Sequence, residues 1–194
     1  MKKRYGILIF CLALALCVSG TLFLRGRPAL LRNEEEPGIT IEDEDVPLGE
    51  APVETAAVDW TEGLDEMQIT AVKAILEQVN AARAAECLAA LVLDPVLCQA
   101  ARVRAAECEK SFSHTRPDGT KYKTAIAEAG ISSGYTGENV ATGYTTVDQA
   151  MAGWLKSDGH RANILNERFT KIGIALKKNS NQYGGYTWEQ LFIA

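Results

Sequence analysis

The sequence predicts an α+β layered domain of about 130 residues, preceded by an apolar segment and an acidic linker. Three observations predict this organisation. Several stretches between residues 64 and 156 carry apolar side chains at helical spacing, residues 172–193 alternate as strands do, and charge is spread very unevenly along the chain. The 194 residues therefore divide into an N-terminal segment (1–24), a linker (25–63) and a folded domain (64–194).

The N-terminal segment contains an uncharged stretch of 20 residues, from Tyr5 to Leu24, with basic residues on both sides. A helix of that length rises about 30 Å and can cross a bilayer, whereas the apolar part of a cleavable signal peptide is usually about 7–15 residues. A transmembrane anchor and a signal peptide both stay open. Either one predicts that the rest of the chain is exported.

The linker carries the net charge of the chain. Residues 34–66 hold 13 acidic and no Lys or Arg residues, whereas residues 67–194 hold 12 acidic and 14 basic ones. Acidic runs mixed with Pro and Gly, without an apolar period, predict a disordered tether over residues 25–63. The folded domain shows no basic stripe interleaved with aromatic residues, so no nucleic-acid partner is predicted.

Four helices are predicted in the folded domain from apolar periodicity and end signals. Asp94 is the expected N-cap of the second helix and Pro95 its first residue. Thr120 is the expected cap of the third helix, which Gly130 stops, and Thr145 opens a capping sequence for the fourth. The four helices are expected over residues 67–87, 95–110, 122–129 and 145–156.

Two strands are predicted near the C-terminus. Ile172, Ile174 and Leu176 alternate with polar or small residues, and a Gly-Gly pair separates them from a second strand over 186–193. A two-stranded ribbon is not stable alone, so helices must cover it. Residues 88–93 and 135–142 are candidates for further short strands.

The cysteines allow at most one disulfide bond in the folded domain, because Cys11 and Cys17 lie in the apolar segment. Cys98 and Cys108 share a predicted helix and would lie about 15 Å apart, too far to pair. Cys87 could pair with one of them. The favoured alternative is that all three are small buried thiols.

Only two histidines occur, and both lie among polar and turn-forming residues: His114 within Phe112–Gly119 and His160 within Asp158–Asn163. Glu138 lies between them in sequence. Two imidazoles and a carboxylate can hold a divalent metal, zinc above all, with modest affinity. The same groups can act as general acid and base, or can simply hold loops in place by hydrogen bonds. A convincing nucleophile is missing, although Ser113 and Ser157 lie nearby in sequence.

Several ordered motifs resemble the bacterial branch of the CAP superfamily, the SCP-like extracellular domain of cysteine-rich secretory proteins, antigens and pathogenesis-related proteins. The resemblance covers about residues 67–194. The motifs that carry it are Asn80–Arg83, Leu93–Pro95, Phe112–Thr120, Gly137–Ala141 and Trp154–Leu165.

The resemblance implies a three-layer α-β-α sandwich, an extracellular setting and a cleft in which His114, Glu138 and His160 converge. Ser157 and Asn139 are the further cleft candidates. Ser157 stands where many eukaryotic members have a second glutamate, and Asn139 is expected to fix the loops beside the cleft.

The sequence therefore predicts an exported, membrane-tethered or secreted CAP-domain protein of the bacterial cell surface, whose His/Glu cleft binds a ligand or a divalent metal. The membrane contact would run through residues 5–24, and the ligand could be a small molecule, a lipid, a cell-wall fragment or a protein. Two alternatives stay open: a metal-assisted or acid–base, peptidase-like hydrolase of envelope or extracellular substrates, and a structural envelope protein. The missing second acid and nucleophile count against the hydrolase.

Overall fold

The computed structural model describes residues 58–180 and 182–194. The predicted N-terminal anchor or signal and most of the predicted linker lie outside these residues. Within the described part of the chain, no helix is both long enough and apolar enough to cross a membrane.

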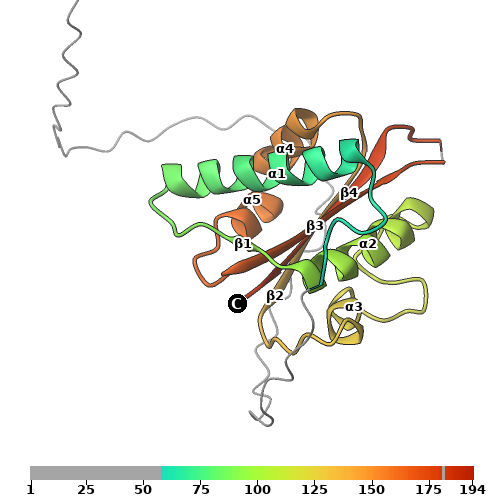
Figure 1. Cartoon of the computed structure of the whole chain (residues 1–194), viewed down its shortest axis with the longest axis horizontal. Helices are drawn as coiled ribbons and strands as arrows, with labels where there is room; N and C mark the ends of the chain where they lie inside the picture. Colours follow the sequence, from blue (N-terminus) through green and yellow to red (C-terminus); the bar gives the residue numbers. More distant parts are fainter. Residues whose placement is uncertain (1–57, 181) are drawn as a thin grey trace, which may run out of the picture. The chain divides into compact units, whose positions relative to one another are not determined.

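The described chain forms three layers, with one sheet between two layers of helices (Figure 1). The sheet has the order β1-β3-β4-β2. Helices α1, α4 and α5 cover one face, and α2 and α3 cover the other. The strands are β1 (Val92–Leu93), β2 (Thr136–Tyr144), β3 (Lys171–Lys178) and β4 (Tyr186–Ile193). The helices are α1 (Glu66–Ala85), α2 (Pro95–Lys110), α3 (Lys123–Glu128), α4 (Val147–Lys156) and α5 (Asp158–Ile164).

The register of β2 against β4 decides which side chains face which helices. The two strands are antiparallel, and Glu138 lies opposite Leu191 while Asn139 lies opposite Gln190. Successive side chains of a strand point to opposite faces of the sheet. Glu138 therefore faces α2 together with Leu191, and Asn139 faces α4 and α5.

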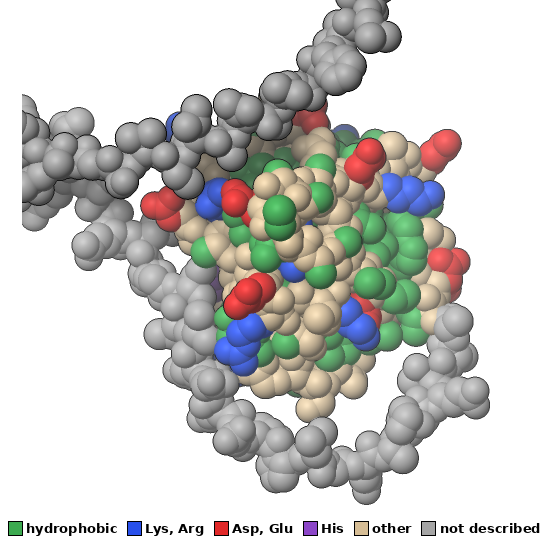
Figure 2. Space-filling view, turned by 90° about the vertical axis from the view of Figure 1, so that its left-hand side faces the viewer, with side chains coloured by type: hydrophobic (Ala, Val, Ile, Leu, Met, Phe, Trp, Pro, Cys, Tyr) green, Lys and Arg blue, Asp and Glu red, His purple; other side chains and the backbone are tan. Residues whose placement is uncertain are grey.

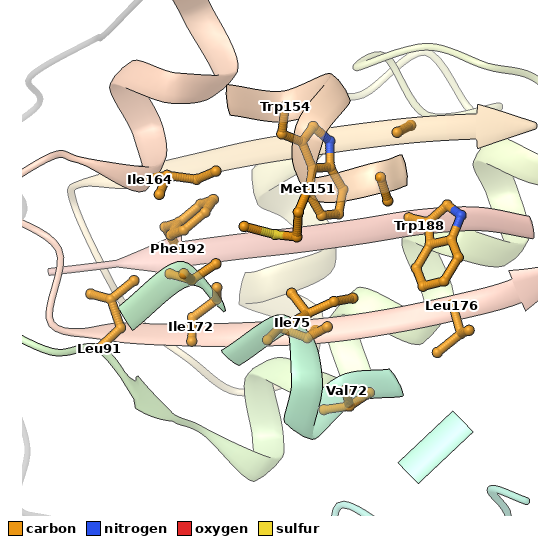
Figure 3. Packing of buried hydrophobic residues seen from close by; sticks show 14 of the residues in the cluster. Val72, Ile75, Leu91, Met151, Trp154, Ile164, Ile172, Leu176, Trp188 and Phe192 are labelled. Carbon is orange, nitrogen blue, oxygen red and sulfur yellow. The ribbon is translucent and has the colours of Figure 1, made fainter. Parts of the chain in front are cut away.

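The larger core lies between the sheet and the layer formed by α1, α4 and α5. Figure 3 shows Trp154 and Met151 of α4 packed near Phe192 of β4, with α1 residues beneath them. Trp154 is 1% exposed and lies within this core. The members labelled in the figure are Val72, Ile75, Leu91, Met151, Trp154, Ile164, Ile172, Leu176, Trp188 and Phe192.

The smaller core lies under α2, whose buried stripe is rich in alanine. Small side chains let this helix approach the sheet closely. At Gly173 of β3, an added Cβ would lie 2.4 Å from the backbone of Leu97, so only glycine fits there. The close approach matters for the site, because α2 brings its polar side chains directly onto the sheet.

Asn80 and Arg83 of α1 anchor the connections around the sheet. The Asn80 amide donates to the Leu91 carbonyl and accepts from the Leu91 amide, at 3.0 and 2.8 Å. Arg83 is 1% exposed, and its guanidinium donates to four backbone carbonyls. Buried backbone carbonyls need such partners, so this motif is structural. The four acceptors are the carbonyls of Ala89, Ile164, Asn166 and Phe169.

Most predicted elements are confirmed, and α2 begins at the expected residues. Asp94 caps α2 by accepting from the Leu97 amide at 3.0 Å, and Pro95 is its first residue. The predicted cap of α3 is wrong, because the Thr120 hydroxyl donates to Asp118 instead. The segment around His160 was expected as a polar loop but forms the short helix α5. Both candidate strand regions do form strands, β1 and β2.

The three cysteines of the described chain are free thiols. Cys98 and Cys108 are buried, as expected, and burial raises the pKa of each thiol to about 11. The expectation that Cys87 is also buried is wrong, because it is exposed. It follows the C-cap of α1 with φ 59°, the left-handed conformation in which helices often end and which glycine adopts most easily.

Charges of both signs are interspersed on the face of the domain shown in Figure 2. This fits the near balance of acidic and basic residues beyond position 66.

Candidate functional site

The site is built on Glu138, a buried residue of the edge strand β2. Its side chain is 1% exposed, and one of its oxygens, Oε2, lies 2.6 Å from Nδ1 of His114. His114 belongs to the loop after α2, and its side chain is 52% exposed. The structure thus brings two of the three predicted site residues together, with a buried carboxylate beneath a half-exposed imidazole.

Arg104 of α2 holds the other oxygen of this carboxylate. Its Nε donates to Oε1 of Glu138 at 2.8 Å, and its Nη2 donates to the Ser113 carbonyl at 2.7 Å. The second bond fixes the residue directly before His114. Burial alone would lower the pKa of the Arg104 guanidinium, but the charge and hydrogen bond of Glu138 outweigh burial and raise that pKa. Arg104 therefore stays charged although it is fully buried.

The ion pair continues outward through alternating charges. Arg104 also pairs with Glu107, Glu107 pairs with Arg116, and Arg116 pairs with Glu128, which is 60% exposed. Burial would raise the pKa of Glu107, but its hydrogen bonds to the two arginines outweigh burial and lower it. Arg116 is 8% exposed and ties the turn after His114 to Glu107 of α2.

These contacts fix the hydrogen arrangement on the His114 ring. A carboxylate can only accept hydrogen bonds, so Nδ1 of His114 carries the hydrogen that points to Glu138. The second ring nitrogen, Nε2, then carries the lone pair that can accept a hydrogen bond or bind a metal. A histidine oriented by a carboxylate in this way can bind a ligand, take up a proton or hold a metal.

His160 reaches the same strand from the opposite face of the sheet. Asn139, the neighbour of Glu138, donates to the His160 backbone carbonyl and to the Gln190 side chain, both at 3.0 Å. Asn163 of α5 donates to Oδ1 of Asn139 at 2.9 Å. Asn139 is fully buried, so it supports the His160 helix as expected and does not line an open cleft.

The remaining predicted residues lie near the start of α5. The His160 side chain is half-buried there. Ser157 ends α4 and precedes α5, and its side chain makes no capping bond to α5. The convergence of the His160 ring with the His114–Glu138 pair stays a prediction.

Gly137 begins the three-residue motif Gly137–Asn139, at a position where the packing leaves no room for a side chain. A Cβ at this position would lie 2.8 Å from Phe169 and 3.1 Å from Asn163, so a larger residue would push both away. The motif therefore combines a close approach at Gly137, a carboxylate that reaches His114 on one face, and an amide that holds α5 on the other.

The metal expectation for His114, Glu138 and His160 meets a limit in this geometry. Among residues 58–180 and 182–194, no group of three His, Cys, Asp or Glu side chains is placed to hold one metal ion. Both oxygens of Glu138 are already engaged by Arg104 and His114. A metal bound by Glu138 would have to displace one of them, so these residues do not fit a zinc site as they stand.

Sequence reasoning missed Arg104 and Glu189. Arg104 lies among Ala101, Ala105 and Cys108 on the buried stripe of α2, so a lone arginine at an apolar helical position was the available signal. Glu189 is fully buried on β4. β4 is covered on both faces and shows no clear alternation, so its sequence gave no sign that this carboxyl group points inward.

The fold and the site define an α-β-α sandwich with a His–Glu pair on an edge strand. Residues 76–192 match the family model described as the Cysteine-rich secretory protein family, or CAP. The chain belongs to this family.

Similar proteins come from several bacteria. The uncharacterized protein YkwD of Bacillus subtilis is 33% identical over 123 residues, which cover 62% of this chain and 46% of YkwD. The uncharacterized membrane protein YlbC of the same organism is 30% identical over 115 residues, 58% of this chain and 33% of YlbC. The chain thus spans less than half the length of these two relatives.

Solved structures with the same fold include an extracellular SCP-domain protein from Bacillus anthracis. It has a TM-score of 0.60 and 25% identity, and the match covers 66% of this chain and 41% of that one. An outer surface protein from Borrelia burgdorferi has a TM-score of 0.58 and 23% identity, with 64% of this chain and 92% of that one covered. The second likeness shows the fold alone.

Proposed function

We propose that this protein is an extracellular CAP-domain binding protein that captures its ligand at the bacterial cell surface through the His114 ring. The observation that carries the proposal is the half-exposed imidazole held at 2.6 Å by a carboxylate that is 1% exposed. Arg104 behind that carboxylate is fully buried, so the ring is supported from the protein interior. Such support fixes the direction of Nε2 and lowers the entropy lost on binding.

The extracellular setting draws on the chain and on its relatives. The apolar stretch of 20 residues near the N-terminus predicts export. The Bacillus anthracis protein is described as extracellular, and YlbC is described as a membrane protein. We infer that residues 5–24 anchor the chain and that the acidic linker holds the domain away from the membrane. Fractionation tests this: the full chain should stay with membranes in high salt and leave them in detergent, and deletion of residues 1–24 should abolish the association.

The binding proposal is tested with two envelope probes, purified peptidoglycan sacculi and phosphatidylglycerol vesicles. We expect the protein to co-sediment with one of them, and His114→Ala and Glu138→Gln to weaken that binding at least about tenfold. Lys121→Ala, in the same loop region, is the control and should bind as the wild type does. His160→Ala shows whether the second histidine contributes. Equal binding by the wild type and His114→Ala, or no binding to either probe, would contradict the proposal.

A metal enters this proposal only as a further ligand to be tested. Calorimetric titration with zinc chloride, on the wild type and on His114→Ala, measures whether the ring binds zinc. Heat of binding that is lost in the variant would add zinc to the ligands of the site.

An acid–base hydrolase is the second candidate, and the carboxylate-oriented imidazole is the observation that favours it. His114 would act as the base that takes a proton from water. A serine or cysteine nucleophile is less favoured, because the Ser113 hydroxyl accepts from the Thr115 amide and the Cys108 thiol is buried with a raised pKa. Turnover of peptides or glycans that disappears in His114→Ala would favour the hydrolase over the binding protein.

A further inference from the structure

Glu189 is a buried carboxyl group that has no role in the site described so far. It lies on the central strand β4 and is fully buried. Neither of its side-chain oxygens has a hydrogen-bond donor within the described residues. Its strand partners are Val140 of β2 and Ala175 of β3, so its side chain leaves the sheet on the face that carries Glu138.

The groups around Glu189 show why it has no donor. Glu138 of β2 lies within hydrogen-bonding reach, and Arg104 and Cys108 of α2 are close enough for their charges to act on Glu189. Tyr122, before α3, is also close enough for the charge of Glu189 to act on it. Of these groups, the one within hydrogen-bonding reach of Glu189 is thus a second carboxyl group. Two carboxylates cannot hydrogen-bond to each other, but a carboxylic acid can donate to a carboxylate.

Arg104 does not supply the missing partner. Its hydrogen bonds go to Glu138, Glu107, Cys108 and the Ser113 carbonyl. Two carboxylates already face this one guanidinium. A third ionised carboxylate in the same interior would leave an uncompensated negative charge, which is strongly unfavourable in a buried environment.

We propose that Glu189 is a protonated carboxylic acid that donates a hydrogen bond to the Glu138 carboxylate and thereby positions the His114–Glu138 pair. Each oxygen of Glu138 has a second lone pair, so it can accept this bond in addition to those from Arg104 and His114. Burial, and next to it the charge of Glu138, raise the pKa of Glu189 well above its ordinary value, in agreement with the geometry.

This arrangement gives Glu138 three fixed partners: a guanidinium from α2, an imidazole from the loop and a carboxylic acid from β4. The pair of glutamates carries one negative charge, which faces Arg104 on one side and His114 on the other. Glu189 acts through Glu138 and is therefore a positioning residue. Its importance for binding rests on the proposed function of His114, whereas its protonation does not.

Glu189→Gln tests the protonation directly, because glutamine has nearly the same shape and its amide can still donate to Glu138. A carboxyl group whose pKa is raised in the folded protein contributes to stability, and this contribution is fully present at pH values below the unfolded-state pKa of about 4.3. The contribution is lost as the pH rises through the folded-state pKa. Glutamine does not titrate. The folding equilibrium constant of Glu189→Gln, divided by that of the wild type, should therefore rise about tenfold per pH unit from about pH 5 up to the folded pKa of Glu189.

The measurement is urea unfolding of the protein between pH 5 and 8, with Glu128→Gln as the matched control. Glu128 is the exposed outer end of the same ion-pair chain, so its ratio to the wild type should stay within about threefold across the range. A ratio for Glu189→Gln that stays flat or falls with rising pH would show that Glu189 is ionised in the folded protein, and would overturn the proposal.

The positioning role has its own readout, the NMR titration of the His114 ring, assigned by its loss in His114→Ala. If Glu189 is protonated, Glu189→Gln replaces one neutral donor with another, and the midpoint of the His114 titration should stay within about 0.3 pH units of the wild-type value. If Glu189 is ionised in the wild type, the same substitution removes a negative charge near the ring, and the midpoint should fall by about one pH unit or more. Glu189→Met removes the donor and should change the ring signals, which Glu189→Gln should leave as in the wild type. Identical His114 spectra in all three proteins would overturn the positioning role. Loss of the proposed ligand binding alone would leave these titrations unchanged, so the two failures can be told apart.

Discussion

Removal of Arg104 is the sharpest test of how the site is held, and Arg104→Met is the variant of choice. Methionine keeps much of the side-chain length but removes the guanidinium. Glu138, with a side chain 1% exposed, would then lose its cation while remaining buried. Breaking a buried ion pair by removing one partner costs about 3–5 kcal/mol. Since small domains have unfolding free energies of about 5–15 kcal/mol, this is a large share of the total.

The same cost can be expressed as a melting temperature. An unfolding entropy of about 2.1 cal/mol/K per residue, over about 135 folded residues, gives about 0.28 kcal/mol/K. Arg104→Met should therefore melt about 10–18 °C below the wild type. Urea unfolding followed by tryptophan fluorescence gives the free energy itself, because Trp154 and Trp188 are buried in the core.

Two further variants separate the ion pair from a general defect in α2. Lys110→Met, on the exposed side of the same helix, should change stability by less than about 0.5 kcal/mol. The double variant Arg104→Met with Glu138→Gln should cost less than the sum of the single variants by about 1–3 kcal/mol, because both charges are gone. A loss below about 1 kcal/mol for Arg104→Met, or additive costs in the cycle, would refute the buried ion pair as the support of the site.

Four other outcomes are expected. Gly137→Ala should lower the unfolding free energy by about 1–3 kcal/mol, since its Cβ would lie 2.8 Å from Phe169; unchanged urea unfolding would contradict this packing. Cys87→Gly should raise the melting temperature by a few degrees, about 1 kcal/mol, because glycine adopts φ 59° without strain; a lower value would mean that the cysteine side chain contributes there. Arg83→Met should cost about 3 kcal/mol or more by unfolding in urea, because four carbonyls lose a donor, and a cost near zero would show that they find other partners. The lowered pKa of Glu107 stabilises the fold above its unfolded pKa of about 4.3, and this contribution is lost as pH falls through the folded pKa. The loss of unfolding free energy on acidification should therefore be smaller in Glu107→Gln than in the wild type, and an equal loss in both proteins would contradict this role of Glu107.

The elements with strong local signals could be predicted from the sequence. Asp94 and Pro95 define the start of α2 because capping and the first-turn proline are local effects. The Gly184–Gly185 pair has positive φ at both residues and marks the turn into β4. α5 could not be predicted in this way. It is too short to be stable alone, and it forms because Asn139 and Asn163 tie it to the sheet.

The site was only partly predictable for a similar reason. His114 and Glu138 could be proposed from the motifs, and the structure brings them together. Arg104 lies 34 residues before Glu138, and the contact between them depends on how closely α2 approaches the sheet. The neighbourhood of Glu138 and Glu189 depends on the register of β2 against β4, which no short motif encodes.

The alternation along β2 also determines which changes in length the site tolerates. Glu138 and Asn139 are adjacent, yet one reaches His114 and the other supports the helix of His160. Deleting one residue earlier in β2 would therefore exchange the two faces: the carboxylate would enter the layer of buried amides, and the amide would meet Arg104. A shift by two residues would restore the faces but move each group about 7 Å along the strand. The length of this strand before Glu138 is therefore fixed by two partners on opposite sides of the sheet.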